Sequence, residues 1–98
     1  MSESKEATTL YRIKLACDGI PPSAGPQGAI DIAEEFTHRP WHQNVRCSWD
    51  GSSLILTAEN DFDKNGRALL DEFSDAVVAC ISDREYTSSI RLLEVTTF

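Results

Sequence analysis

One segment of the chain carries side chains whose types and spacing could bind a cation. Asp61, Asp63 and Asn65 alternate along it, Gly66 follows, and Glu72 stands at the twelfth position counted from Asp61. Calcium takes about six to eight oxygen ligands, which side chains on alternate residues of a loop can supply around one ion. Glycine at the sixth position permits the sharp turn, and glutamate at the twelfth closes the coordination shell. The segment therefore predicts a calcium site made by Asp61, Asp63, Asn65 and Glu72.

In its residue types this segment resembles the loop of an EF-hand, and the resemblance covers residues 61–72 alone. It implies a calcium-binding module in which Arg67 offers its backbone carbonyl. The context differs from that family in three ways. The preceding residues alternate like a strand, Ala68 stands where a bulky aliphatic residue is usual, and the sequence has no second loop to pair with the first.

The same residues also suit the start of a helix. Asp61 or Asp63 could accept hydrogen bonds from the first helical amides, where a negative charge is favourable. The two interpretations differ in where the helix begins. A cap at Asp63 predicts a start near Lys64, whereas calcium ligation predicts helix only beyond Leu69.

Two histidines and three cysteines are the other residues suited to chemistry. His38 and His42 have the spacing of two metal ligands on one helical face, but Pro40 between them breaks a helix. An odd number of widely spaced cysteines is typical of reduced thiols in a core rather than of a disulfide framework. The cysteines are Cys17, Cys47 and Cys80. We therefore expect no catalytic residue, and no cofactor other than the calcium candidate.

The elements that must position these residues follow from periodicity. Apolar residues alternate with polar ones in the first strand and around an Asp-Gly turn, whereas they follow helical spacing after Pro26 and after Leu69. In chain order, the predicted elements are a strand over 10–17, a helix from Pro26 to near His38, a hairpin within 42–60, a helix ending near Ile81, a polar connection over 82–89 and a strand over 90–98.

This order predicts an α+β fold with a four-stranded antiparallel sheet and two helices on one face. It resembles the ferredoxin-like βαββαβ arrangement, also called split β-α-β. With right-handed crossovers, the first and third strands are central and the second and fourth lie at the edges. We expect one domain over residues 10–98, preceded by a disordered segment over residues 1–9.

The composition of the chain argues against two classes of partner, nucleic acids and membranes. The chain has 98 residues with 9 Lys+Arg against 16 Asp+Glu, for a net charge of −7. Such a chain repels phosphate backbones unless its basic residues cluster, and they are dispersed along the sequence, so we expect no nucleic-acid partner. Because no apolar run is long enough for a signal peptide or a bilayer span, we expect a cytoplasmic protein with no membrane partner.

Two helices on one face leave the other face of the sheet to solvent, a partner or a ligand. We expect interaction residues at Arg12, Lys14 and Arg46 on that face, with Trp41 as an exposed anchor. The sequence thus predicts a non-catalytic interaction or regulatory module, self-associating as a homodimer through the open sheet face or an edge strand. The alternatives are the calcium-binding module and a small-molecule enzyme of the dimeric ferredoxin-like type, with a pocket between the sheet and residues 18–26. An enclosed cavity lined by His38 or His42 would favour the enzyme.

Overall fold

The structure is a computed structural model that describes residues 9–81 and 87–98. The predicted disordered segment lies outside these residues except for Thr9, and most of the predicted connection over 82–89 also lies outside them. The described elements are β1 (Tyr11–Asp18), α1 (Gly25–Glu35), a short 3-10 helix (Phe36–His38), β2 (Gln43–Trp49), β3 (Leu54–Asn60), α2 (Arg67–Cys80) and β4 (Ser89–Thr97).

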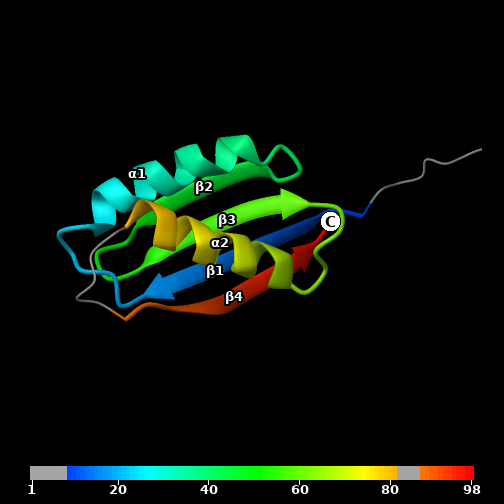
Figure 1. The fold of residues 1–98 in the computed structure, drawn as a ribbon. Coiled ribbons are helices and arrows are strands. Elements are labelled where there is room, and N and C mark those ends of the chain that lie inside the picture. Colours follow the sequence, from blue (N-terminus) through cyan, green and yellow to red (C-terminus); the bar gives the residue numbers. More distant parts are fainter. Residues whose placement is uncertain (1–8, 82–86) are drawn as a thin grey trace, which may run out of the picture.

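The four strands form one antiparallel sheet in the order β2-β3-β1-β4. β3 and β1 are therefore central, while β2 and β4 are the edges. Figure 1 shows α1 and α2 side by side on one face of this sheet. The fold is thus α+β, with two helices and a four-stranded antiparallel sheet, and the opposite face of the sheet carries no helix.

Local sequence explains most of the boundaries. In β1 the alternating residues Ile13, Leu15 and Cys17 have no exposed surface, because they face the helices. α1 carries a proline in its first turn, where the missing amide hydrogen costs nothing. The β2–β3 hairpin turns at Asp50, whose Oδ1 accepts hydrogen bonds from the amides of Ser52 and Ser53 at 2.8 and 2.7 Å.

Leu92 and Leu93 are adjacent in β4, so alternation alone does not determine which face of the strand is buried, and a bulge does. The register of β4 against β1 shifts between Lys14 and Leu15, so that Leu92 pairs with Leu15 while Glu94 pairs with Lys14. Leu92 therefore lies on the helix side and Glu94 on the open face. Leu93 is the extra residue of the bulge.

The core lies between the sheet and the helices, and α1 covers β2 closely. A Cβ placed on Gly25 of α1 would lie 2.2 Å from the ring of Trp49 in β2. Only a residue without a side chain allows this approach. The largest fully buried side chains include Phe36, Phe73, Ile13, Leu15 and Ile32. Among the described residues, no helix has the length and apolar character needed to cross a membrane.

Candidate functional site

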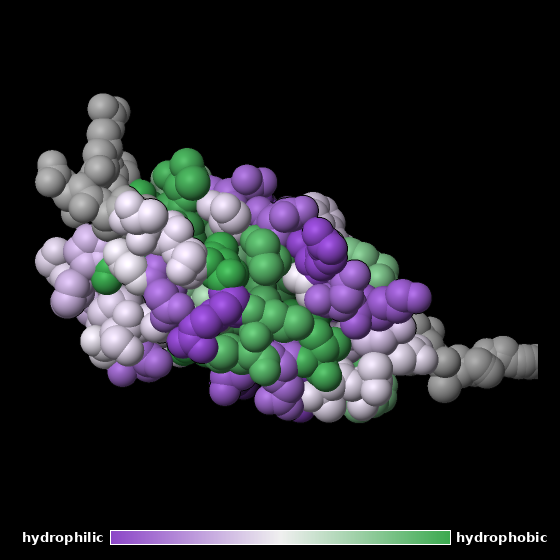
Figure 2. Space-filling view, turned by 90° about the horizontal axis from the view of Figure 1, so that it is seen from below, coloured by the Kyte–Doolittle hydropathy of each residue, from purple (hydrophilic) through white to green (hydrophobic). Residues whose placement is uncertain are grey.

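The edge strand β4 presents the most concentrated apolar surface of the described chain. Among the described strands, none pairs with its outer edge. Leu92 is 47% exposed, Leu93 is 39% exposed, and Phe98 just after the strand is 54% exposed. Figure 2 looks onto the side of the molecule where β4 lies and shows apolar residues gathered into one continuous area. The other exposed apolar side chains are scattered over α1, α2 and the loops.

A hollow of about 320 Å³ continues this apolar surface toward α2. Leu92 forms the wall on the strand, while Leu70 and the backbone at Gly66 form the wall on the helix. A Cβ on Gly66 would lie 3.1 Å from Leu92, so the glycine keeps the hollow open. Arg67 and Asp71 flank the hollow with opposite charges one helical turn apart. We call β4, Phe98 and this hollow the β4 surface.

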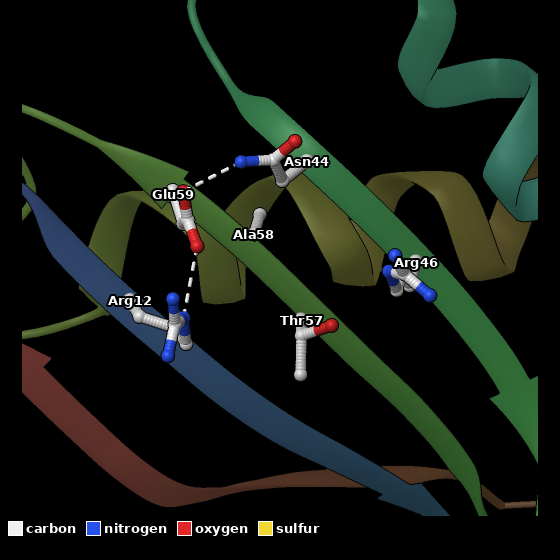
Figure 3. A pocket seen from close by; sticks show the side chains of 6 residues that line it. All are labelled: Arg12, Asn44, Arg46, Thr57, Ala58 and Glu59. Atoms are coloured by element: carbon white, nitrogen blue, oxygen red, sulfur yellow. Dashed lines mark hydrogen bonds and ion pairs between the residues drawn. The ribbon is translucent and has the colours of Figure 1, made fainter.

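The open face of the sheet is mostly polar and has a hollow of its own, of about 430 Å³ (Figure 3). Glu59 of β3 lies inside it and is only 7% exposed. Its carboxylate accepts hydrogen bonds from Asn44 Nδ2 and Arg12 Nε, both at 2.8 Å. These two bonds, with that from Asn44 the larger influence, lower the pKa of Glu59 below its ordinary value, so the carboxylate stays ionised.

The structure brings three of the four predicted interaction residues together. Lys14 is paired with Thr57 across β1 and β3, and Thr57 with Arg46 across β3 and β2, so they share the open face with Arg12. Trp41 is on the helix side instead. It is 50% exposed, and its indole Nε1 donates to the Glu72 carboxylate of α2 at 3.2 and 3.3 Å.

The residues of the predicted calcium site do not converge on one point. Asp63 is buried, and its two carboxylate oxygens accept hydrogen bonds from the amides of Ala68 at 3.1 Å and Leu69 at 2.8 Å. Asn65 Oδ1 accepts from the Arg67 amide at 3.0 Å. The helix begins at Arg67, between the starts that the two interpretations predicted. Asp63 therefore holds the first turn of α2.

Glu72 is committed to a different set of partners. Besides Trp41, its carboxylate lies 3.0 Å from Arg39 Nε and 3.2 Å from His42 Nε2. It therefore ties α2 to the segment that enters β2. Across the described part of the chain, no three His, Cys, Asp or Glu side chains lie close enough to hold a metal ion. Calcium binding stays a prediction that requires Glu72 to leave these partners.

The two histidines lie in different surroundings, since His38 lines a hollow of about 440 Å³ between α1 and α2 whereas His42 is buried. His42 is 6% exposed and lies among the rings of Phe36, Trp41 and Phe62, while Asn60 Nδ2 lies 3.2 Å from its Nδ1. Because β2 runs parallel to β1, His42 is at the end of the sheet opposite the loop over 18–26. The predicted antiparallel sheet, with its first and third strands central, already implied this direction, so His42 and the loop over 18–26 could have been separated from the sequence.

The cysteines are free thiols. Burial is the main cause that raises the pKa of Cys17 to about 11 and that of Cys47 to about 12. Burial also raises the pKa of Cys80. Thiols with raised pKa values are poor nucleophiles at neutral pH, because little thiolate forms.

A carboxylate clamp joins β4 to β1, which sequence reasoning did not find. Asp18 accepts hydrogen bonds from Arg91 Nε at 2.6 Å and from Ser53 Oγ at 2.5 Å. The Arg91 bond is the main cause that lowers the pKa of Asp18. Asp18 and Arg91 are far apart in the sequence, so only their opposite charges could have indicated that they form a pair.

Comparison with protein-family models, with curated proteins and with solved structures finds no significant match to this chain.

Proposed function

We propose that this protein is a non-catalytic interaction module that self-associates through the β4 surface. The observation that carries the proposal is the exposure of Leu92, Leu93 and Phe98 on and beside an edge strand of nine residues. An unpaired strand edge offers a row of backbone donors and acceptors to another strand. Apolar side chains beside that edge supply the burial that hydrogen bonds alone do not.

A second copy of the chain fits this surface because its charges are self-complementary. Arg91 and Glu94 flank the leucines of β4, so antiparallel pairing about a two-fold axis brings each arginine toward the partner's glutamate. Arg67 and Asp71 at the hollow repeat the same alternation of sign. The dimer would thus have one continuous sheet. The net charge of −7 on each copy opposes association, and salt reduces that repulsion.

The element order and the strand order β2-β3-β1-β4 support a ferredoxin-like assignment within the α+β class. Backbone nuclear Overhauser effects between β1 and both of its neighbours would test this assignment in solution. Absence of contacts between β1 and β4 would contradict it.

Analytical ultracentrifugation over a range of concentrations tests self-association. The wild type should be dimeric, and Leu93→Glu should weaken dimerisation at least about 100-fold, because it buries two unpaired carboxylates at the interface. Ile30→Glu is the matched control, since Ile30 is a 61% exposed residue on α1. It should leave the dimer intact, and raising the salt concentration should strengthen the wild-type dimer.

A third variant separates the edge from the open face. Ile55 lies on the open face, because it pairs with Ala16 of β1 and Ser48 of β2. Ile55→Glu should not affect the dimer. A monomeric wild type, or a dimer lost in Ile55→Glu and retained in Leu93→Glu, would overturn the proposal.

A further inference from the structure

The hollow on the open sheet face is shaped by a bulge at the start of β2. The register between β2 and β3 shifts between Gln43 and Arg46. Asn44 at this shift has a φ of 51°, in the left-handed region that residues other than glycine rarely adopt. Its side chain is held by Glu59. A strained residue beside a hollow is typical of sites where a bulge re-aims side chains.

Two cations beside this hollow have no partner among the described residues. Arg46 lines the hollow, and neither its guanidinium nor the Lys14 ammonium makes a described hydrogen bond or ion pair. Lys14 is opposite Glu94 in register, yet the Glu94 carboxylate accepts from Thr96 Oγ1 at 2.8 Å instead. Between the cations stands Thr57, whose hydroxyl oxygen points toward Arg46 in Figure 3.

The clustering of charge is unusual for this chain. Arg12, Lys14, Arg46 and Arg91 all share the open face by register, although they are dispersed in the sequence and acidic residues dominate overall. Arg91 and Arg12 are neutralised by Asp18 and Glu59. Unpaired like charges near one another are destabilising unless an anion lies between them.

We infer that Arg46, Thr57 and Lys14 bind the phosphate of a small phosphomonoester at the edge of the hollow on the open face, which Arg46 and Thr57 line and which Lys14 adjoins by register. The arginine fork matches two phosphate oxygens, and the threonine hydroxyl and lysine ammonium are placed for the others. A phosphate dianion balances the charge of two cations, whereas a single carboxylate balances only one. The volume of the hollow, about 430 Å³, is within the range of small-ligand sites.

Binding can be measured by amide chemical shifts of the full chain titrated with inorganic phosphate, with sodium chloride at equal ionic strength as the reference. Shifts at Arg46 and Thr57 should saturate, with a dissociation constant of about 1 mM. Arg46→Gln and Lys14→Gln should each weaken binding about 10-fold, because each removes a charge-assisted bond. Arg46→Lys should weaken it less. Lys64→Gln is the matched control, since Lys64 is an exposed lysine of the segment before α2, and should have no effect.

Glycerol phosphate provides the second arm of the titration. Binding at least as tight as that of inorganic phosphate supports a phosphomonoester ligand, and weaker binding overturns that part of the inference. Absence of saturable shifts, or equal weakening in Arg46→Gln and Lys64→Gln, would overturn the site itself. All of these variants alter exposed side chains, so an unchanged amide spectrum away from the hollow verifies folding.

Discussion

The two edges of the sheet differ in how far they are covered. β2 has seven residues, a bulge at Asn44, and close cover from α1, with Trp49 packed against Gly25. None of its large apolar side chains is exposed. β4 has nine residues, and its leucines are open on the side toward α2. A short strand and a covering helix are usual means of blocking edge-to-edge pairing, and they distinguish β2 from β4, since both strands carry a bulge.

The difference shows at which edge of the sheet the apolar side chains are covered. The two helices cover the inward side chains of β2 in part and leave the leucines of β4 exposed. The sheet therefore has one covered edge and one open edge. Under the proposed self-association, this asymmetry limits assembly to one side, which favours a closed dimer over an open chain of strands.

The largest expected difference between the edges is in stability. Trp49→Ala should lower the free energy of unfolding by about 2–3 kcal/mol, because it leaves a cavity beneath α1. Leu92→Ala should cost about 1 kcal/mol in the monomer, since nearly half of its side chain is already in water. Urea unfolding at a concentration where the protein is monomeric measures both. Equal losses would show that the two edges are covered alike.

Sequence reasoning succeeded where a structure depends on neighbours along the chain. Alternation in β1, the Asp50-Gly51 turn and the prolines around α1 predicted their elements because each acts within a few residues. Local spacing could not show that Glu72 binds Trp41, which lies 31 residues earlier. The predicted calcium ligands were chosen from spacing alone, which does not show the partners that Asp63 and Glu72 have in the fold.

The bulge at Asn44 was equally hidden, because a register shift is a relation between two strands. Asparagine tolerates the left-handed region better than most residues, and this was the one signal available. The same limit applies to the basic residues. They are dispersed in sequence and meet only when three strands lie in register.

Lowering the pH should reduce the free energy of unfolding through a contribution from each edge. The reduction should be smaller than that caused by Trp49→Ala. Each edge has one carboxylate clamp, Asp18 to Arg91 at β4 and Glu59 to Asn44 at β2. The pKa of each carboxyl is lowered in the folded state. Such a group stabilises the fold above its unfolded pKa, and this contribution is lost as the pH falls through the folded pKa.

Asp18→Asn and Glu59→Gln test the two clamps separately. The difference in unfolding free energy between the wild type and each variant should be constant near neutral pH. It should shrink as the pH falls below the ordinary values of 3.8 for Asp18 and 4.5 for Glu59. Urea unfolding across this range measures it. A difference that does not depend on pH would show that the clamp acts by shape rather than by charge.

Calcium should have the smallest effect. The start of α2 lines the β4 surface, and Glu72 contacts the segment that enters β2, so an ion at Asp61, Asp63, Asn65 and Glu72 would disturb both edges. Because Asp63 and Glu72 are already bound within the protein, we expect millimolar calcium to leave the midpoint of thermal unfolding unchanged. Magnesium is the control.

A calcium-specific rise of about 10 °C would contradict this expectation and restore the cation site. Asp61→Ala would then have to abolish the rise, since Asp61 is exposed and its loss should not disturb the helix cap.

The side-chain amide of Asn60 determines which nitrogen of the neutral His42 ring carries the hydrogen. Its Oδ1 accepts from the amides of Phe62 and Asp63, at 3.2 and 2.8 Å, which leaves Nδ2 as the group facing His42 Nδ1. Nδ1 must then be an acceptor, so the neutral imidazole carries its hydrogen on Nε2, toward Glu72. The backbone amides of the turn after Asn60 fix the orientation of its side chain, and that orientation sets the tautomer of His42. One side chain orients both the loop that leads to α2 and the ring that closes the end of the core.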